Sequence, residues 1–354
     1  MLVGGGMKTG NLFKDKAAKN PAVAQEQIPI IDIGPYLRDE AGAIDLLAQK
    51  LKNACEQVGF FYIRDHGIPE DVIEIAFNQN RRFHAQSIEK KRALKIDQYN
   101  VGYLEINTST QAHSTVHKAT KPNQNESFFV SHDRPPDHPD RIKAVPLRGG
   151  NYWPTELSGF REGVMAYFSA MNGLGQKLLA PFAVSMGLEP DGFEDLFSNE
   201  NHAVLRLLHY PPTKITDNDF GTGPHTDNSF FTILARMEVP GLAIRLPSGE
   251  WVAPPLIENT FLVNIGNIMR RMTNDHFLST PHGVIVEGEK DRYSMAYFHS
   301  PNPYKMIEVL DTFTESGHHR KYEPALYADL IMEFFAANYT HQKNHRLLDI
   351  KNQY

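Results

Sequence analysis

The first part of the chain alternates between short apolar runs and stretches whose apolar residues recur at every third or fourth position. IPIIDI at 28–33 predicts a strand, and the apolar positions over 44–58 predict an amphipathic helix that a glycine ends. GFFYIRDHGIP at 59–69 predicts a second strand and a turn, after which a second helix begins at Pro69. This region therefore has α/β character.

The next part of the chain changes from a polar segment to one long helix. Residues 100–152 contain few apolar runs and a proline-rich stretch, RPPDHPDR at 134–141, so they are predicted to be irregular. A structureless segment of this length is uncommon in a compact domain, and loops of this kind often line binding sites. Apolar residues on one face then predict a long helix over 155–187, with a bend at Pro181.

Beyond Leu188 the chain breaks into short runs of β-forming residues separated by turn residues, and a final helix is predicted at 325–339. The predicted strands are 203–210, 230–236, 242–246, 260–266, 283–286 and 292–298. This pattern is typical of a sandwich or a double-sheet jelly roll. The expected fold is therefore mainly β with flanking helices: a double-stranded β-helix (jelly-roll) core with an α/β N-terminal region.

These patterns divide the chain into four parts. Residues 1–27 are expected to form a flexible leader, 28–190 the α/β region packed on the core, 191–312 the jelly-roll core, and 313–354 a C-terminal loop and helix. Met7 is a candidate for the natural start, with an added leader before it.

Composition excludes several classes of protein. A net charge of −6 argues against nucleic-acid and anionic-membrane binders, which normally carry a basic surface. The single cysteine, Cys55, forms no intrachain disulfide and is expected to pack in the core. The start lacks the apolar core of a signal peptide, and no apolar run approaches about 20 residues. A cytoplasmic protein without membrane or nucleic-acid partners is expected, and the sequence leaves its oligomeric state open.

A histidine and an aspartate stand one residue apart in GPHTDNSFFTILAR, just before a predicted strand. Side chains at i and i+2 of a strand point to the same face, so His225 and Asp227 are expected to aim at one spot. Intervening strands would bring His282 back beside them. Two histidines and a carboxylate on one face of a metal form the facial triad of non-haem iron(II) oxygenases, although the same ligands also suit zinc.

A second i, i+2 pair follows ten residues after His282. Arg292 and Ser294 are expected to share one face of a strand, where a guanidinium and a hydroxyl suit a bound carboxylate. A lone HxD pair is common in a chain with 16 histidines. The combination of this pair with His282, Arg292 and Ser294 makes a metal site the better interpretation.

With these motifs the sequence resembles the isopenicillin N synthase-like branch of the iron(II)- and 2-oxoglutarate-dependent oxygenases. The resemblance extends to IPIIDI and GFFYIRDHGIP, and to GLAIRLPSGEWVAPPLIENTFLVNIGN in the core. Within the branch, LRLLHYP and RYSMAYFHSPNPYK look most like fungal thymine dioxygenases and their bacterial relatives. That likeness lies in the scaffold and says little about the substrate.

The resemblance implies a role for each of these residues. Fe(II) would be ligated by His225, Asp227 and His282. The distal carboxylate of 2-oxoglutarate would be held by Arg292 and Ser294. Tyr210 would lie beside this cosubstrate. The enzyme would then use O2 to oxidise a small molecule, by hydroxylation, desaturation or ring formation, with release of succinate and CO2. The chain departs from the family pattern in the second shell, at Leu208, Gly283 and Asn267.

The substrate pocket is harder to predict. Phe298 shares a strand face with Arg292 and Ser294, while Tyr103 and Phe128 come from the polar segment that we expect to enclose the substrate together with the C-terminal helix. Each of the three could equally be a core residue. Three further histidines are expected to be solvated: His209, His318 and His319.

Two alternatives stay open. An iron oxidase of the isopenicillin N synthase type keeps the RxS pair for a carboxylate of its own substrate and needs no 2-oxoglutarate. A non-catalytic metal- or ligand-binding jelly roll is the alternative from another class, and the intact set of ligands argues against it.

Overall fold

The computed structural model describes residues 27–111, 114, 116, 121–213, 219–286, 288–314 and 319–342. Residues 1–26 of the expected leader, which include Met7, therefore lie outside the described residues. His318 also lies outside them. No helix in the described ranges is long and apolar enough to cross a membrane.

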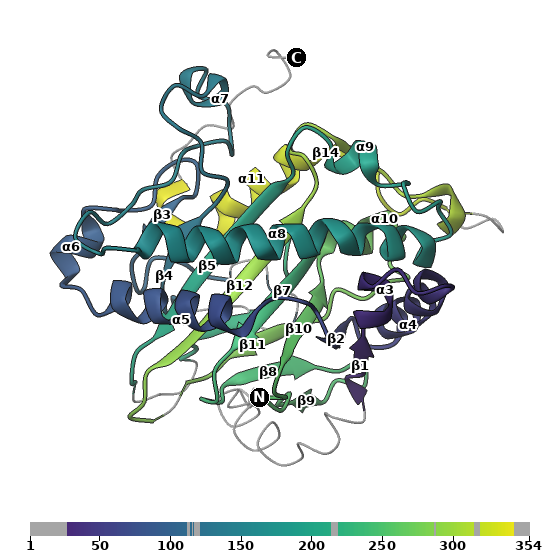
Figure 1. Cartoon of the computed structure of the whole chain (residues 1–354), viewed down its shortest axis with the longest axis horizontal. Helices are drawn as coiled ribbons and strands as arrows, with labels where there is room; N and C mark the ends of the chain where they lie inside the picture. Colours follow the sequence, from purple (N-terminus) through teal and green to yellow (C-terminus); the bar gives the residue numbers. More distant parts are fainter. Residues whose placement is uncertain are drawn as a thin grey trace, which may run out of the picture.

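An eight-stranded sheet forms the larger wall of the fold (Figure 1). Its strands lie in the order β1 (Ile30–Asp32), β2 (Phe60–Arg64), β10 (Thr260–Ile265), β7 (Phe231–Arg236), β12 (Arg292–Ser300), β5 (His202–Tyr210), β4 (Glu126–Val130) and β3 (Gly102–Leu104). Only the β1–β2 pair is parallel among the pairings of this described sheet. The long β5 and β12 pair along their whole length, which fixes the register at the centre of the wall.

A smaller four-stranded sheet faces the large one. Its strands lie in the order β6 (Thr222–His225), β11 (His282–Val284), β8 (Leu242–Arg245) and β9 (Trp251–Val252). A buried cluster drawn from both sheets fills the space between them, with Tyr62 and Leu208 from the large sheet and Ile244 and Val284 from the small one. Two facing sheets around one apolar interior form the jelly roll that the sequence predicts.

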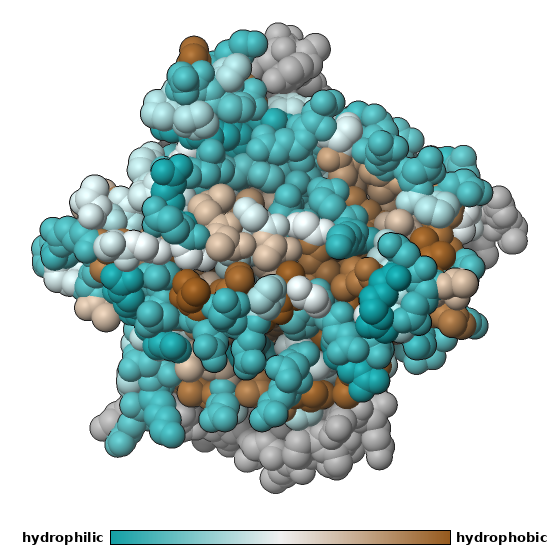
Figure 2. Space-filling model, in the orientation of Figure 1, coloured by the Kyte–Doolittle hydropathy of each residue, from teal (hydrophilic) through white to brown (hydrophobic). Residues whose placement is uncertain are grey.

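Three helices cover the outer face of the large sheet: α4 (Ala43–Gln57), α5 (Glu70–His84) and α8 (Phe160–Ser185) (Figure 1). Phe182 of α8 stacks on Phe231 of β7 with ring centres 5.2 Å apart, and Pro181 lies inside this helix. Removing so large a buried ring would cost about 3 to 5 kcal/mol. On this face of the molecule, hydrophobic side chains gather in a band along α8 among mostly hydrophilic ones (Figure 2). Cys55 of α4 is fully buried, as expected of a packing residue.

The remaining described elements are short, apart from the C-terminal helix α11. They are α3 (Gly34–Leu37), α6 (Ile88–Arg92), α7 (Pro139–Ile142), α9 (Glu194–Phe197), α10 (Asn267–Met272), α11 (Tyr327–Asn338), two 3₁₀ turns (Asp311–Phe313 and Thr340–Gln342), and the paired strands β13 (Met306–Ile307) and β14 (Ala325–Leu326). The predicted C-terminal helix is thus found, one turn shorter than expected.

The segment 100–152 is more regular than the sequence predicts. It contains β3, β4 and α7, and β4 pairs with β5 over five residues. ESFFV at 126–130 is buried along its whole length, so its short apolar run was the overlooked signal of a central strand. Strands of the N-terminal region consequently belong to the large sheet itself, with β1–β2 at one edge and β4–β3 at the other.

Candidate active site

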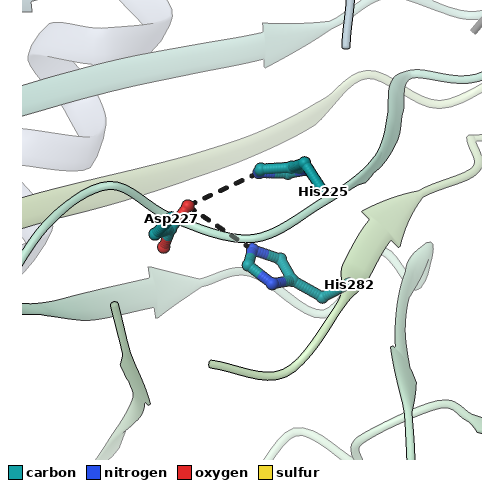
Figure 3. A group of neighbouring side chains, drawn as sticks. All are labelled: His225, Asp227 and His282. Carbon is teal, nitrogen blue, oxygen red and sulfur yellow. Dashed lines mark ion pairs between the residues drawn. The ribbon is translucent and has the colours of Figure 1, made fainter. Parts of the chain in front are cut away.

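Three side chains that could bind a metal converge at one end of the small sheet (Figure 3). His225 is the last residue of β6 and pairs directly with His282, the first residue of β11. Asp227 lies after the end of β6, so the expectation that it follows His225 along one strand face is wrong. The turn between β6 and β7 instead brings its Oδ1 to 3.5 Å from His225 Nε2 and 3.8 Å from His282 Nε2. The three candidate ligand atoms all lie within 4.8 Å of one another.

Backbone carbonyls orient both imidazoles. His225 Nδ1 lies 2.8 Å from the Gly223 carbonyl oxygen, and His282 Nδ1 lies 3.2 Å from that of Thr280. A carbonyl oxygen only accepts, so each Nδ1 carries the hydrogen and each Nε2 keeps its lone pair. Hydrogen bonding of the far ring nitrogen is the usual second-shell arrangement of a metal-binding histidine.

The Asp227 carboxylate divides its two oxygens between different tasks. Its Oδ2 accepts hydrogen bonds from Thr232 Oγ1 at 2.6 Å and Asn264 Nδ2 at 2.8 Å, which leaves Oδ1 facing the histidines. Burial raises the pKa of Asp227, but the neighbouring His282 and His225 and the Thr232 hydroxyl outweigh it, so the pKa lies below its usual value. Burial lowers the pKa of His282 to about 4. Near neutral pH the group thus offers a carboxylate and a neutral imidazole, the forms that bind metals.

A buried guanidinium stands on the next wall of the barrel. Arg292 begins β12, is 2% exposed, and donates from Nη1 to Ser294 Oγ at 3.3 Å. Its Nε has no hydrogen-bond partner, and none of the ion pairs within the described residues involves it. Tyr210 lies directly opposite on β5, and its hydroxyl lies 3.1 Å from Thr222 Oγ1. A buried cation without an anion is unfavourable, so this arrangement suits an anionic ligand.

Two cavities share lining residues of this group, among them His225 and Asp227. The inner chamber lies between the sheets and is lined by the His225, Asp227 and His282 group together with Arg292 and Ser294. The outer chamber, of about 80 Å³, lies between the barrel mouth and α11. A wider entrance of about 290 Å³ adjoins it and is lined by residues of the 100–152 segment and of α11, such as Gln111 and Phe334.

Only one of the three predicted pocket residues lines a chamber. Phe298 lines both chambers, whereas Tyr103 and Phe128 line neither and lie in the core with Phe83 of α5. The two are cross-strand partners on the helix-covered face of the large sheet. Strand alternation explains the error, because Phe129, one residue further on, faces inward and lines the outer chamber.

His209 also departs from its prediction. It points away from Tyr210 as expected, but it is only 7% exposed rather than solvated. Its Nδ1 lies 2.8 Å from Glu126 Oε1 and its Nε2 lies 2.7 Å from Asp291 Oδ1. His319 is exposed, as predicted.

Sequence reasoning missed several residues of the site. Thr232 and Asn264 are cross-strand partners that hold Asp227, and each is a polar residue in an otherwise apolar strand. Arg206 lines both chambers. It stands two and four residues before Leu208 and Tyr210, so alternation along β5 places it on their face. That signal was available in the sequence.

Comparisons with known proteins agree with this geometry. A sequence model of the 2OG-Fe(II) oxygenase superfamily matches residues 201–301, and one of the non-haem dioxygenase in morphine synthesis N-terminal family matches 28–156. The 2-oxoglutarate-Fe(II) type oxidoreductase hxnY of Emericella nidulans is 30% identical over 320 residues, which cover 88% of this chain and 90% of that protein. Homoarginine-6-hydroxylase 2-ODD-C23 of Glycine max is 30% identical over 320 residues, covering 85% and 94%.

Solved structures show the same likeness. The crystal structure of a full-length Neurospora crassa protein in complex with alpha-KG and thymine superposes with a TM-score of 0.76 at 27% identity, over 88% of this chain and 96% of that one. This chain is thus an oxidoreductase of the 2OG-Fe(II) oxygenase superfamily, a dioxygenase that uses iron(II), 2-oxoglutarate and O2.

Proposed function

We propose that His225, Asp227 and His282 hold the iron of this oxygenase and that the inner chamber binds its 2-oxoglutarate. The observation that carries the proposal is the convergence of two imidazole Nε2 atoms and one carboxylate oxygen beside a buried arginine without an anionic partner. Two histidines and one carboxylate are the ligands of the facial triad, in which the remaining positions of the metal would be left to other ligands, and His225 and Asp227 line both chambers. Bound iron would supply the activation of O2 for substrate oxidation.

Arg292 and Ser294 are proposed to fix the far carboxylate of 2-oxoglutarate. Both side chains project from one face of β12, and they line the same chamber as the metal-ligand candidates. The guanidinium and the hydroxyl offer parallel donors that match a carboxylate. A five-carbon acid with a second carboxylate can then extend from Arg292 toward the iron, which favours a dicarboxylate cosubstrate over a substrate-only oxidase.

The protein itself contributes placement and the exclusion of water. Tyr210 supports the Arg292 guanidinium, and Thr232 with Asn264 holds Asp227 so that Oδ1 stays available. We propose that a small-molecule substrate enters beneath α11 and lies in the outer chamber, where Phe298 separates it from the cosubstrate. A cytoplasmic location agrees with the lone buried cysteine, which needs no oxidising compartment.

Succinate formation tests this proposal. Purified protein supplied with iron(II), ascorbate, O2 and 2-oxoglutarate should convert 2-oxoglutarate slowly to succinate even before a substrate is known. Zinc in place of iron should abolish the conversion, since zinc has no redox chemistry. Absence of succinate under every condition, with a product formed from a screened metabolite without 2-oxoglutarate, would contradict the assignment of the inner chamber to 2-oxoglutarate.

A further inference from the structure

A second buried arginine faces the outer chamber. Arg206 on β5 is 8% exposed, and it lines the chamber together with His225 and Asp227. Its Nε donates to Ser127 Oγ at 2.9 Å and its Nη2 to Asn125 Oδ1 at 2.9 Å. Both partners are neutral. Within the described residues, no carboxylate lies at ion-pair distance from this guanidinium, which instead lies 5.0 Å from the centre of the Phe129 ring.

The hydrogen bonds of Arg206 are incomplete. A guanidinium has five N–H donors, and the two bonds to Ser127 and Asn125 leave three of them without a protein acceptor. Aromatic contact with Phe129 compensates a buried cation only in part. Since His202, another lining residue, has its pKa lowered to about 3 by burial, it is neutral near pH 7 and adds no charge.

The charges of the proposed holoenzyme do not balance without an additional anion. Iron(II), Arg292 and Arg206 bring four positive charges to the two chambers, and Asp227 with 2-oxoglutarate brings three negative ones. One positive charge is therefore left over. Arg206 lines both chambers, whereas Arg292 lines only the inner one, so Arg206 is the cation within reach of a ligand in the outer chamber. A substrate that carries one negative charge completes the balance.

Aromatic side chains form much of the remaining wall of the outer chamber, beside polar residues such as Asn228 and Ser229. Phe129 and Phe298 come from the large sheet, and Phe334, Phe335 and Tyr339 come from α11 and the residue after it. Such walls favour a flat apolar body, because aromatic rings pack face to edge or offset against one another. The chamber therefore combines one cationic end with a ring-binding interior.

We propose that the substrate is a small aromatic carboxylate, bound through its carboxylate by Arg206 and with its ring among the aromatic side chains beneath α11. Arg206 is thus the residue that sets specificity for an acid. The inference rests on the proposed function, since it takes the outer chamber as the substrate site. It goes beyond that proposal by naming the chemical class of the substrate and the residue that recognises it.

Binding to matched pairs of ligands tests the inference without any turnover. The protein, loaded anaerobically with iron(II) and 2-oxoglutarate, is titrated in a calorimeter with benzoate, phenylacetate and cinnamate, and with the primary amide of each. At least one acid should bind about tenfold to a hundredfold tighter than its amide, the usual gain from charge-assisted hydrogen bonds. Thymine serves as the neutral ring with carbonyl acceptors.

Two variants assign the preference to Arg206. Arg206→Gln should remove the preference for the acid while leaving the affinity for the amide and for 2-oxoglutarate within about threefold. Arg148→Gln is the matched control: this arginine is also 8% exposed but pairs with Asp140 and Glu200 away from both chambers. The control should keep the preference. If Arg206→Gln fails to fold, Arg206→Lys takes its place. This variant keeps the charge but loses the paired N–H donors of the guanidinium, so it should lower the acid affinity by a smaller factor than expected for Arg206→Gln.

Three results would overturn the inference: equal binding of every acid and its amide, tighter binding of thymine than of any acid, or an undiminished acid preference in Arg206→Gln. A selective loss of 2-oxoglutarate binding in that variant would also overturn it, by assigning Arg206 to the cosubstrate. Succinate formation by the same preparation distinguishes a failure of this inference from a failure of the proposed function. Succinate without an acid preference contradicts only this inference, whereas absence of succinate contradicts the proposed function on which it rests.

Discussion

The guanidinium of Arg292 lies 4.8 Å from the centre of the Tyr210 ring, because the two residues face each other directly across β12 and β5. The ring supports one side of the guanidinium without supplying an anion. Burial lowers the pKa of Arg292, yet arginine stays charged at any physiological pH. The strand register thus presents a permanent, supported cation to the inner chamber.

Replacing this cation should act on the cosubstrate alone. We expect Arg292→Gln to raise the concentration of 2-oxoglutarate required for succinate formation by about tenfold to a hundredfold, since a charge-assisted bond contributes about 1.5 to 3 kcal/mol. Iron binding, measured by equilibrium dialysis, should barely change. Arg245→Gln, on β8 of the small sheet and outside the inner chamber, is the control. Equal iron loss and 2-oxoglutarate loss in Arg292→Gln would point to a collapsed site instead.

The hydroxyl that holds Asp227 should matter for the metal. We expect Thr232→Val, which is close in shape but lacks the 2.6 Å hydrogen bond to Oδ2, to weaken iron affinity by about tenfold to a hundredfold. Thr260→Val on β10 is the control, because that hydroxyl bonds only the Ile257 carbonyl oxygen. Competition with a chelator measures both affinities. Wild-type affinity in Thr232→Val would show that Asn264 alone positions the carboxylate.

A buried ion pair outside the site should be costly to break. Lys91 Nζ lies 2.8 Å from Glu126 Oε2, and both side chains are 9% exposed. Lys91→Met leaves Glu126 without that partner and should lower the free energy of unfolding by about 3 to 5 kcal/mol. The adjacent Lys90 pairs with Glu156 at the surface, so Lys90→Met should cost less than about 1 kcal/mol. Urea denaturation of both variants makes the comparison, and similar losses would contradict it.

Acid should destabilise the protein below about pH 6.5. Burial lowers the pKa of His84, His202 and His299 to about 3. Between pH 6.5 and 3 the unfolded chain binds protons that the folded chain does not, so their contribution to stability is complete above pH 6.5 and is lost as the pH falls. Each group then costs at most about 1.4 kcal/mol per pH unit. Urea midpoints measured from pH 7.5 to 5 should fall steadily.

One variant isolates this effect. His299 stacks between Phe197 and Phe231, with ring centres 5.1 Å and 5.0 Å away, and its Nε2 is without a partner. His299→Phe keeps a ring in the stack and should make the decline less steep, because His84 and His202 still contribute. His319→Phe, at an exposed position, should leave the dependence unchanged. An equally steep decline in His299→Phe would assign the acid sensitivity to other groups.

The sequence predicts the elements whose apolar pattern is strong. The long runs over 203–210, 260–266 and 292–298 became β5, β10 and β12 with small shifts at their ends. The short β6, over Thr222–His225, was missed because TGPH contains a glycine and a proline and has no alternation to read. The motif spacing therefore found the His225 and Asp227 pair correctly as neighbours, although the assumed strand geometry between them was wrong.

Side-chain faces were predictable only where the register was known. Alternation along β12 predicts that Arg292, Ser294 and Phe298 share one face. Two polar residues and one aromatic residue at alternate positions identify that face, and all three line the inner chamber. The strand that contains Phe128 has no such marker, and a shift of one residue reverses the face of a strand. The burial of His209 depends on Glu126, 83 positions earlier in the chain. A partner at that separation leaves no local signal.

The direct pairing of His225 with His282 joins β6 to β11 at the edge of the barrel. An ion bound by both residues would close a loop of 57 positions through coordinate bonds, and the unfolded chain has no such site. Folding and metal loading are then thermodynamically linked: a free metal concentration a hundred times the dissociation constant adds about 2.7 kcal/mol to stability. Metal supply would therefore set the fraction of the protein that is folded, in addition to whether the enzyme turns over.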